Sequence, residues 1–250
     1  MAPVSAFSAA FEEAGIEVSA HEIRREMGLE KRRHLERMLN DEGIASRWRS
    51  VHGSNPARRD VDSLYEAFEK HLAQALPRHA DPIYGLLDVV AQLRASGIKI
   101  GSNSGYDARM MNILSEAAIA YGFEPDCIVS ASDVSNGRPA PDLSLRCLQL
   151  LRLDHDCAAL KVDDTRAGIE EGRRAGLWTA AVAISGNEIG LSFQQWSALD
   201  RREQRHLRDR AYGRVGAWGA DYAIDTVADL GRVIADITAR AKVGKTTEAR

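Results

Sequence analysis

The sequence predicts an α/β protein in which a helical module precedes a domain built on a parallel β-sheet. Two observations support this prediction. In the first 80 positions, apolar residues recur at the three- and four-residue spacing of helices. From residue 83 onward, short apolar runs of strand length alternate with helical patterns, which is typical of βαβ units and parallel sheets. We therefore expect two modules, at residues 1–80 and 81–250.

Four helical patterns make up the first module. Its apolar residues repeat on one face over 4–14, 19–27, 30–40 and 61–76. Gly15 ends the first pattern, Gly28 breaks the second, and Pro77 ends the last. Glycine favours left-handed caps at helix ends, and proline cannot continue a helix. The first module is therefore expected to be all-helical.

The second module alternates strands with helices. Short apolar runs predict strands at 98–100, 127–129, 159–162, 179–184 and 222–224. The patterns around them predict helices at 86–95, 108–121, 143–151 and 167–175. The charged stretch at 197–214 also has a helical pattern, and we interpret it as a solvated helix face rather than a basic patch for nucleic acid.

The composition narrows the class of protein and its partners. The chain has 250 residues, 33 basic and 36 acidic side chains and 44% apolar residues, which excludes an intrinsically disordered chain. The net charge of -3 gives no reason to expect nucleic acid or a membrane as partner, and no apolar run approaches the roughly 20 residues of a membrane span. The chain begins without a basic signal-peptide region, and its three cysteines show no CxxC spacing. We expect a cytoplasmic protein with neither a disulfide framework nor a zinc site.

Three loops at predicted strand ends carry polar groups, and open α/β sheets bind ligands at the carboxyl ends of their strands. The loop at 101–106 offers hydroxyl and backbone N–H groups that suit a phosphate-like anion. Arg138 lies in a turn-rich loop and can present its guanidinium to phosphoryl oxygens. Asp163 and Asp164 suit a hard cation such as Mg²⁺. Taken singly, each loop also has a plain structural explanation: an ordinary Ser/Gly turn, a surface arginine, and an aspartate that caps the helix opening at Thr165.

Taken together, the three loops occur in the order found in the haloacid dehalogenase superfamily, and the chain resembles its phosphonatase family over nearly its whole length. The matching stretches are APVSAF, MGLEKRRHL, ADPIYG, GIKIGSNSGY, GRPAP, KVDDT, AGLWT and SGNEIGLS. The resemblance implies a parallel-sheet α/β core with an α-helical cap, the cap over residues 1–80 and the core over 81–250. It also implies an activity, because phosphonatases cleave the carbon–phosphorus bond of phosphonoacetaldehyde to acetaldehyde and phosphate, with Mg²⁺.

The resemblance further implies roles for individual residues. In this family a cap lysine condenses with the aldehyde, so that an enamine leaves in place of a carbanion. Lys31 falls on that position, and His34, three residues further on, matches a histidine that assists proton movement. The implied substrate-binding residues are Met27, Gly28, Ser104, Tyr106 and Arg138, and the implied ligand of Mg²⁺ is Asp164.

Four features depart from the family pattern. Asn103 replaces a common threonine, Asp163 stands where the family usually has glycine, and Gly168 stands where it usually has a further aspartate. The first strand and its DxAGT motif, which holds the nucleophilic aspartate, would precede Ala2 and have no counterpart. We expect a gene model begun at an internal methionine, a sheet without its central first strand and a chain that is inactive as written. The alternatives are a catalytically inactive homologue and a generic phosphatase of the superfamily in which Lys31 is incidental.

Two partners are implied, a small-molecule phosphonate and a second copy of the chain. The family is usually dimeric through its cap helices, so we expect a homodimer. The apolar face around Phe7, Phe11 and Trp48 is compatible with such an interface.

Overall fold

The computed structural model of the chain describes residues 2–76, 81–153 and 158–248, and the side chains of residues 3–241 within those ranges. Contacts between Cα atoms divide the chain into two units. Unit 1 comprises Met1–Asp81, Ser104–Glu124 and Ser130–Ser132, and unit 2 comprises Pro82–Asn103, Pro125–Val129 and Asp133–Arg250. In the part of the chain that is described, no helix combines the length and the apolar character needed to cross a bilayer.

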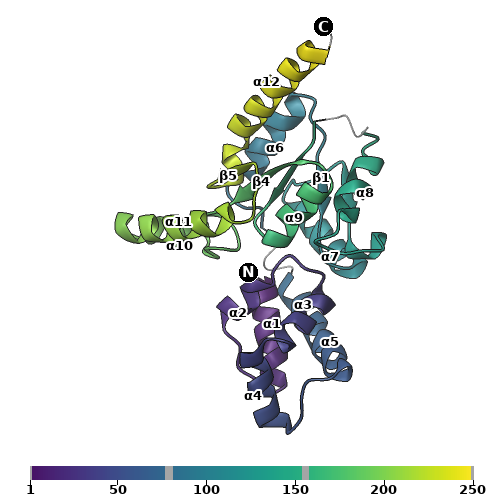
Figure 1. Cartoon of the computed structure of the whole chain (residues 1–250), viewed down its shortest axis with the longest axis vertical. Coiled ribbons are helices and arrows are strands. Elements are labelled where there is room, and N and C mark those ends of the chain that lie inside the picture. Colours follow the sequence, from purple (N-terminus) through teal and green to yellow (C-terminus); the bar gives the residue numbers. More distant parts are fainter. Residues whose placement is uncertain (1, 77–80, 154–157, 249–250) are drawn as a thin grey trace. The chain divides into compact units, whose positions relative to one another are not determined.

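Unit 1 is built from helices (Figure 1). They are α1 (Ala2–Glu13), α2 (Ala20–Arg25), α3 (Lys31–Leu39), α4 (Glu42–His52), α5 (Arg58–Ala75) and α7 (Ala108–Ala120). The four predicted helical patterns of the first 80 residues are confirmed. Gly15, at a φ of 76°, follows the end of α1, and Ser19 begins α2 through a capping box with Glu22. Pro77, expected to end the last of these helices, lies outside the described residues.

The sequence patterns do not predict α4. Its N-cap is Asp41, whose carboxylate accepts hydrogen bonds from the backbone N–H groups of Gly43 and Ile44. The helix has 11 residues and buries only Ile44, Ala45 and Trp48. So short an apolar stripe gives a weak periodic signal, and the capping aspartate is the sequence feature that could have revealed the helix.

The core of unit 1 lies between its helices, where α1 and α5 pack along each other (Figure 1). The rings of Phe7 and Phe68 stack with centroids 4.2 Å apart. Phe7 and Phe11 are fully buried and Trp48 is 4% exposed. The apolar face that the sequence offered for a dimer interface is therefore the internal core of unit 1. The homodimer stays a prediction without support from these three residues.

Unit 2 holds the strands, and every described pairing between them is parallel, as predicted. The strands are β1 (Gly101–Asn103), β2 (Cys127–Val129), β3 (Leu160–Asp163), β4 (Trp178–Val182) and β5 (Tyr222–Ile224). They form two sheets in the described part of the chain, one of order β1-β2 and one of order β3-β4-β5. The carboxyl ends of β1, β2 and β3 therefore lead into the three polar loops that the sequence singled out.

One predicted strand was misplaced. The sequence places a strand at 98–100, whereas the paired segment is β1, three residues further on. The register pairs Gly101 with Cys127, the first residue of β2. Ile100 precedes this register and instead receives a hydrogen bond from Asp126 N and donates one to the Asp126 carboxylate. Ile98 and Ile100 are only half-buried and lie before the sheet, whereas the ladder itself runs through the small residues of β1.

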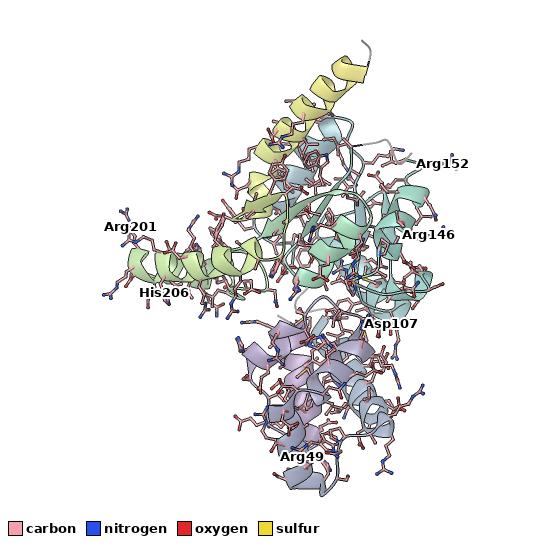
Figure 2. All side chains as sticks on the ribbon, viewed as in Figure 1. Arg49, Asp107, Arg146, Arg152, Arg201 and His206 are labelled. Atoms are coloured by element: carbon pink, nitrogen blue, oxygen red, sulfur yellow. The ribbon has the colours of Figure 1, made fainter. Side chains whose placement is uncertain are left out.

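Helices cover the sheets of unit 2. They are α6 (Leu86–Ala95), α8 (Asp142–Leu150), α9 (Arg166–Arg174), α10 (Phe193–Ala198), α11 (Arg201–Gly216) and α12 (Leu230–Glu248). Helix α9 packs closely on β3, since a Cβ on Gly172 would meet the Lys161 side chain at 2.6 Å. Helix α11 buries only Ala211 and Val215, and its Arg201 and His206 point away from the ribbon (Figure 2). Its exposed charges match the solvated face predicted for this stretch.

Candidate active site

The turn between α2 and α3 sets Lys31 at the first position of a helix. Gly28 holds a φ of 95°, a conformation that glycine adopts without strain. Glu30 caps α3, because its carboxylate accepts hydrogen bonds from two backbone N–H groups of the first turn. Met27, half-buried, lies in the same turn. This turn therefore carries three of the residues that the sequence predicted for the site.

A loop of unit 1 that is distant in sequence lies against this turn. The Nζ atom of Lys31 is 5.1 Å from the centroid of the Tyr106 ring, and Lys31 is only 5% exposed. A Cβ on Gly105 would come within 2.9 Å of the Leu29 carbonyl oxygen. Ser104 Oγ accepts a hydrogen bond from Tyr106 N at 3.2 Å. Burial raises the pKa of Tyr106, so its phenol stays protonated beside Lys31.

His34 lies inside the helical core of unit 1. It is fully buried, and its ring centroid is 4.1 Å from that of Phe7. Its Nε2 contacts Ile23 O at 2.9 Å, and because a carbonyl only accepts, Nε2 must donate. Its Nδ1 then carries a lone pair and has no partner among the described residues. Burial, followed by the charge of Lys31, lowers the pKa of His34 well below its usual value, so the imidazole is neutral.

In unit 2, Arg138 is held in a buried cluster of charges. Its Nε donates to Glu171 Oε2 at 2.6 Å, and its Nη2 donates to Asn103 Oδ1 at 2.6 Å. Nη2 also lies 3.1 Å from Asp163 Oδ2. Lys161 Nζ donates to the same Asn103 oxygen at 2.6 Å. Burial disfavours the charged guanidinium, but the two carboxylates outweigh it and raise the pKa of Arg138.

Asp163, which ends β3, and Gly168, in α9, share one space. A Cβ on Gly168 would overlap the carboxylate of Asp163, closer than the 3.0 Å that real Cβ atoms keep. Asp163 Oδ1 accepts hydrogen bonds from Thr165 N and from Thr165 Oγ1, at 3.0 and 2.7 Å. Burial favours the neutral acid, yet Arg138 and Lys161 outweigh it and lower the pKa of Asp163. The carboxylate of Asp163 thus occupies the place of a side chain at 168, and glycine there follows from it.

Asp164 directly follows β3 and differs from Asp163 in its charge balance. Its Oδ2 accepts a hydrogen bond from Asn187 N at 2.8 Å. Burial and the charge of Asp163 raise its pKa to about 6. A shielded carboxylate that lacks an ion-pair partner in the described structure suits a cation. Among the described residues, no group of three or more His, Cys, Asp or Glu side chains is placed to hold a metal, and the role of Asp164 as a metal ligand stays a prediction.

Comparison with known proteins identifies the family. A family model described as haloacid dehalogenase-like hydrolase matches residues 2–182. This chain belongs to the haloacid dehalogenase-like hydrolases. A protein named phosphonoacetaldehyde hydrolase from Hahella chejuensis is 42% identical over 230 residues, which cover 92% of this chain and 78% of that protein. Its namesake from Klebsiella pneumoniae is 40% identical, over 98% of this chain and 91% of that protein.

The comparison of structures agrees. The crystal structure of a phosphonoacetaldehyde hydrolase-like protein from Oleispira antarctica matches with a TM-score of 0.94 and 42% identity, over 97% of this chain and 88% of that chain. The resemblance read from the motifs, and the α/β fold that it implied, are thereby confirmed.

In this haloacid dehalogenase-like hydrolase, the predicted site residues fall into two groups. Unit 1 brings Lys31 and Tyr106 together, with Gly28 and Ser104 in the two loops that carry them. In unit 2, Arg138 from the loop between β2 and α8 contacts Asp163, which ends β3 and directly precedes Asp164. Their roles in catalysis stay predictions.

Sequence reasoning missed Lys161 and Glu171 of this hydrolase. Lys161 lies two residues before Asp163 in β3, and the period of two in a strand places both side chains on one face. Lys161 could therefore have been found. Glu171 offered no such signal, because a glutamate within a helix is usually exposed, whereas this one is fully buried.

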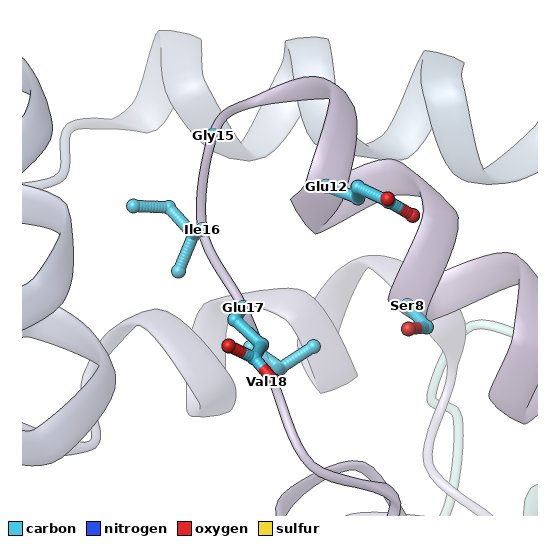
Figure 3. A pocket seen from close by; sticks show the side chains of 6 residues that line it. All are labelled: Ser8, Glu12, Gly15, Ile16, Glu17 and Val18. Atoms are coloured by element: carbon cyan, nitrogen blue, oxygen red, sulfur yellow. The ribbon is translucent and has the colours of Figure 1, made fainter.

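A surface pocket of the hydrolase lies apart from these residues (Figure 3). It has a volume of about 510 Å³ and is lined by residues of α1 and the segment that follows it: Ser8, Glu12, Gly15, Ile16, Glu17 and Val18. None of the predicted site residues lines it.

Proposed function

We propose that this chain is a phosphonoacetaldehyde hydrolase, which cleaves the carbon–phosphorus bond of its substrate to acetaldehyde and phosphate. The observation that carries the proposal is the buried Lys31 beside Tyr106, in a chain 42% identical to a relative of that name. A lysine shielded from water at the start of a helix has the setting of an amine that attacks a carbonyl carbon.

In the proposed reaction, Lys31 Nζ attacks the aldehyde carbon and water leaves, which gives a Schiff base. A carboxylate then attacks phosphorus and takes the phosphoryl group, while the electron pair of the broken carbon–phosphorus bond moves toward the iminium nitrogen to form an enamine instead of a carbanion. Water hydrolyses the resulting acyl phosphate and releases phosphate. Protonation of the enamine carbon and hydrolysis of the imine release acetaldehyde and free the lysine. Tyr106, which stays protonated, covers one side of Lys31. His34 has an unprotonated Nδ1, which makes it a candidate for proton movement in this half of the reaction.

The phosphonate group needs donors and positive charge. We assign it Ser104, whose hydroxyl lies in the loop of Tyr106, and Arg138 of the buried cluster. Asp164 fits a divalent cation by its charge balance, and Mg²⁺ bound there would neutralise the phosphoryl oxygens. Gly28 and Met27 would line the aldehyde end, in the turn that carries Lys31.

The attack on phosphorus belongs, in this proposal, to a carboxylate outside the residues described. Both oxygens of Asp163 are engaged, one by Thr165 and the other by Arg138 and Lys161. Glu171 is fully buried, and Asp164 is assigned to the metal. Among the described residues, we therefore expect the groups that form the Schiff base but not the nucleophile that completes turnover.

Borohydride trapping tests this function. Incubating the chain with phosphonoacetaldehyde and borohydride should reduce the Schiff base and leave the phosphonoethyl group of the uncleaved substrate on Lys31, as found by peptide mass spectrometry. Lys31→Ala should abolish the label. Lys70→Ala is the matched control, because Lys70 lies in the same unit and pairs with Glu13 at the surface.

Two outcomes would contradict the proposal. Labelling that persists in Lys31→Ala would remove the proposed role of this lysine. Phosphate release without acetaldehyde, unaffected by Lys31→Ala, would assign the chain to the generic phosphatases of its superfamily.

A further inference from the structure

Glu171 is the most buried carboxylate near Arg138, and both of its oxygens are engaged. Oε2 accepts from Arg138 Nε at 2.6 Å and lies 3.5 Å from Lys161 Nζ. Oε1 accepts from Asn103 Nδ2 at 2.9 Å and from the hydroxyl of Ser144. A buried charge is costly unless it is paired and hydrogen-bonded in this way. The neighbours of Glu171 on all sides therefore fix the position of its carboxylate.

The Arg138 guanidinium is fixed along one edge by this carboxylate and by Asn103. Nε is bound to Glu171, while Nη2 is bound to Asn103 Oδ1 and lies beside Asp163. Nη1 has no hydrogen-bond partner among the described residues. A planar guanidinium held at Nε and Nη2 presents Nη1 in one direction only. Nη1 is thus the donor that remains for an incoming anion.

We propose that Glu171 is a positioning residue, which orients Arg138 toward the phosphonate through its contact with Nε. The proposal rests on the anion-binding role given to Arg138 above. Glu171 itself touches no substrate, since its two oxygens are occupied by protein donors. Asn103 takes part in the same frame, because its amide oxygen faces the two cations and its amide nitrogen faces the carboxylate.

The direction in which Glu171→Gln changes the affinity for an anion distinguishes a positioning role from a purely electrostatic one. Arg138 and Lys161 carry two positive charges, which Glu171 and Asp163 offset. Replacing Glu171 by glutamine removes a negative charge and, on charge alone, should strengthen binding of an anion. If Glu171 acts by orienting Arg138, the same change should weaken binding, because a guanidinium without its anchor samples other directions.

The experiment uses Glu171→Gln, with Glu170→Gln as the matched control. Glu170 lies next in sequence on α9 and pairs at the surface with Arg166 and Arg174. Titration with inorganic phosphate should give a dissociation constant about tenfold higher for Glu171→Gln, the loss expected when one charge-assisted contact is misplaced. In Glu170→Gln the constant should stay unchanged.

A nuclear magnetic resonance readout makes the test independent of phosphate affinity. The Nε–H signal of Arg138, assigned through its loss in Arg138→Lys, should be protected from solvent exchange in the parent chain. In Glu171→Gln that protection should fall. An unchanged signal, or phosphate binding that is equal or tighter, would overturn the proposal.

A second variant covers the case in which Glu171→Gln does not fold. Glu171→Asp keeps the charge but shortens the side chain, so a role through charge alone leaves the affinity for phosphate unchanged, whereas positioning weakens it.

In an Arg138→Lys background, which lacks Nε, Glu171→Asp should cause no further loss of phosphate affinity. An additive loss would contradict the proposed route through Arg138. Neither phosphate binding nor the Arg138 signal involves an aldehyde or Lys31, so failure here is distinguishable from failure of the proposed hydrolase.

Discussion

At the scale of single residues, two neighbouring aspartates at one strand end have pKa values that are shifted in opposite directions. Asp163 is neutralised by Arg138 and Lys161, whereas Asp164 has its pKa raised by burial and by Asp163 itself. The sequence shows only two identical side chains in a row. Which of them is satisfied by the protein depends on Lys161 from the same strand and Arg138 from another loop. That difference favours Asp164 over Asp163 as the ligand of the proposed cation.

The raised pKa of Asp164 predicts that replacing its carboxyl group by an amide increases the free energy of unfolding at neutral pH. The folded state binds the proton more tightly than the unfolded chain, because the pKa rises from 3.8 to about 6. Stability contributed by this group is therefore present at low pH and is lost as the pH rises from about 4 through 6. In Asp164→Asn, the free energy of unfolding in EDTA at pH 7.5 should increase by about 1–3 kcal/mol, and the difference should vanish near pH 4.

Denaturant unfolding across this pH range checks the prediction. Asp209→Asn on the exposed face of α11 is the control and should show no such trend. Added Mg²⁺ should stabilise the parent chain and leave Asp164→Asn unaffected. A variant that is less stable than the parent at pH 7.5 without metal would show that Asp164 is already compensated by the protein.

At the scale of elements, most of the helices and the parallel strands could be predicted from periodicity, because burial imposes the spacing of apolar residues. The exceptions have physical causes. The segment at 98–100 is apolar but lies before the ladder, which pairs Gly101 with Cys127. The contact between the α2–α3 turn and the loop of Ser104 and Tyr106 could not be read from the sequence, because it depends on tertiary packing between segments more than 70 residues apart.

Substitution of Gly105, which lies at that contact, and of Gly213, which lies at no contact, should have opposite effects on stability. A Cβ on Gly105 would come within 2.9 Å of a backbone oxygen of Leu29, which cannot rotate away. Gly105→Ala should lower the free energy of unfolding by about 1–3 kcal/mol, as overpacking does. Gly213 lies within α11 with nothing within 4 Å of its Cβ position. Gly213→Ala should raise stability by about 0.5–1 kcal/mol, because alanine favours a helix.

Thermal unfolding of the two variants beside the parent chain measures both effects. Trapping of Lys31 by borohydride should also decrease in Gly105→Ala and stay unchanged in Gly213→Ala. Equal stability of the two variants would mean that the turn and the loop are not in close contact.

At the scale of the whole molecule, the resemblance predicted the family and the activity. The packing showed that the apolar residues expected at a dimer interface lie inside unit 1. Phe7, Phe11 and Trp48 form the core of unit 1 rather than its surface. A single sequence shows that such residues must be buried, but it does not show against which partner, because a second helix and a second subunit offer the same apolar environment.

We expect the chain to form a homodimer, as the family resemblance implies. Light scattering coupled to size-exclusion chromatography should give twice the mass of one chain. Because Phe11 belongs to the core of unit 1, Phe11→Ala should lower the free energy of unfolding by about 3–5 kcal/mol and act on the fold rather than on the dimer interface. A mass of one chain at micromolar concentration would refute the homodimer.

The shared space of positions 163 and 168 also constrains how these two positions can evolve. An aspartate at 168 cannot enter while Asp163 keeps its present position, because the two side chains would overlap. A lineage can therefore move its carboxylate between the two positions only by changing both at once or by passing through glycine at both. The second route leaves Arg138 and Lys161 without one of their two carboxylate partners. We therefore expect sign epistasis between these two codons: the two functional sequences are separated by an intermediate of lower fitness, and related sequences should carry the carboxylate at one position or the other.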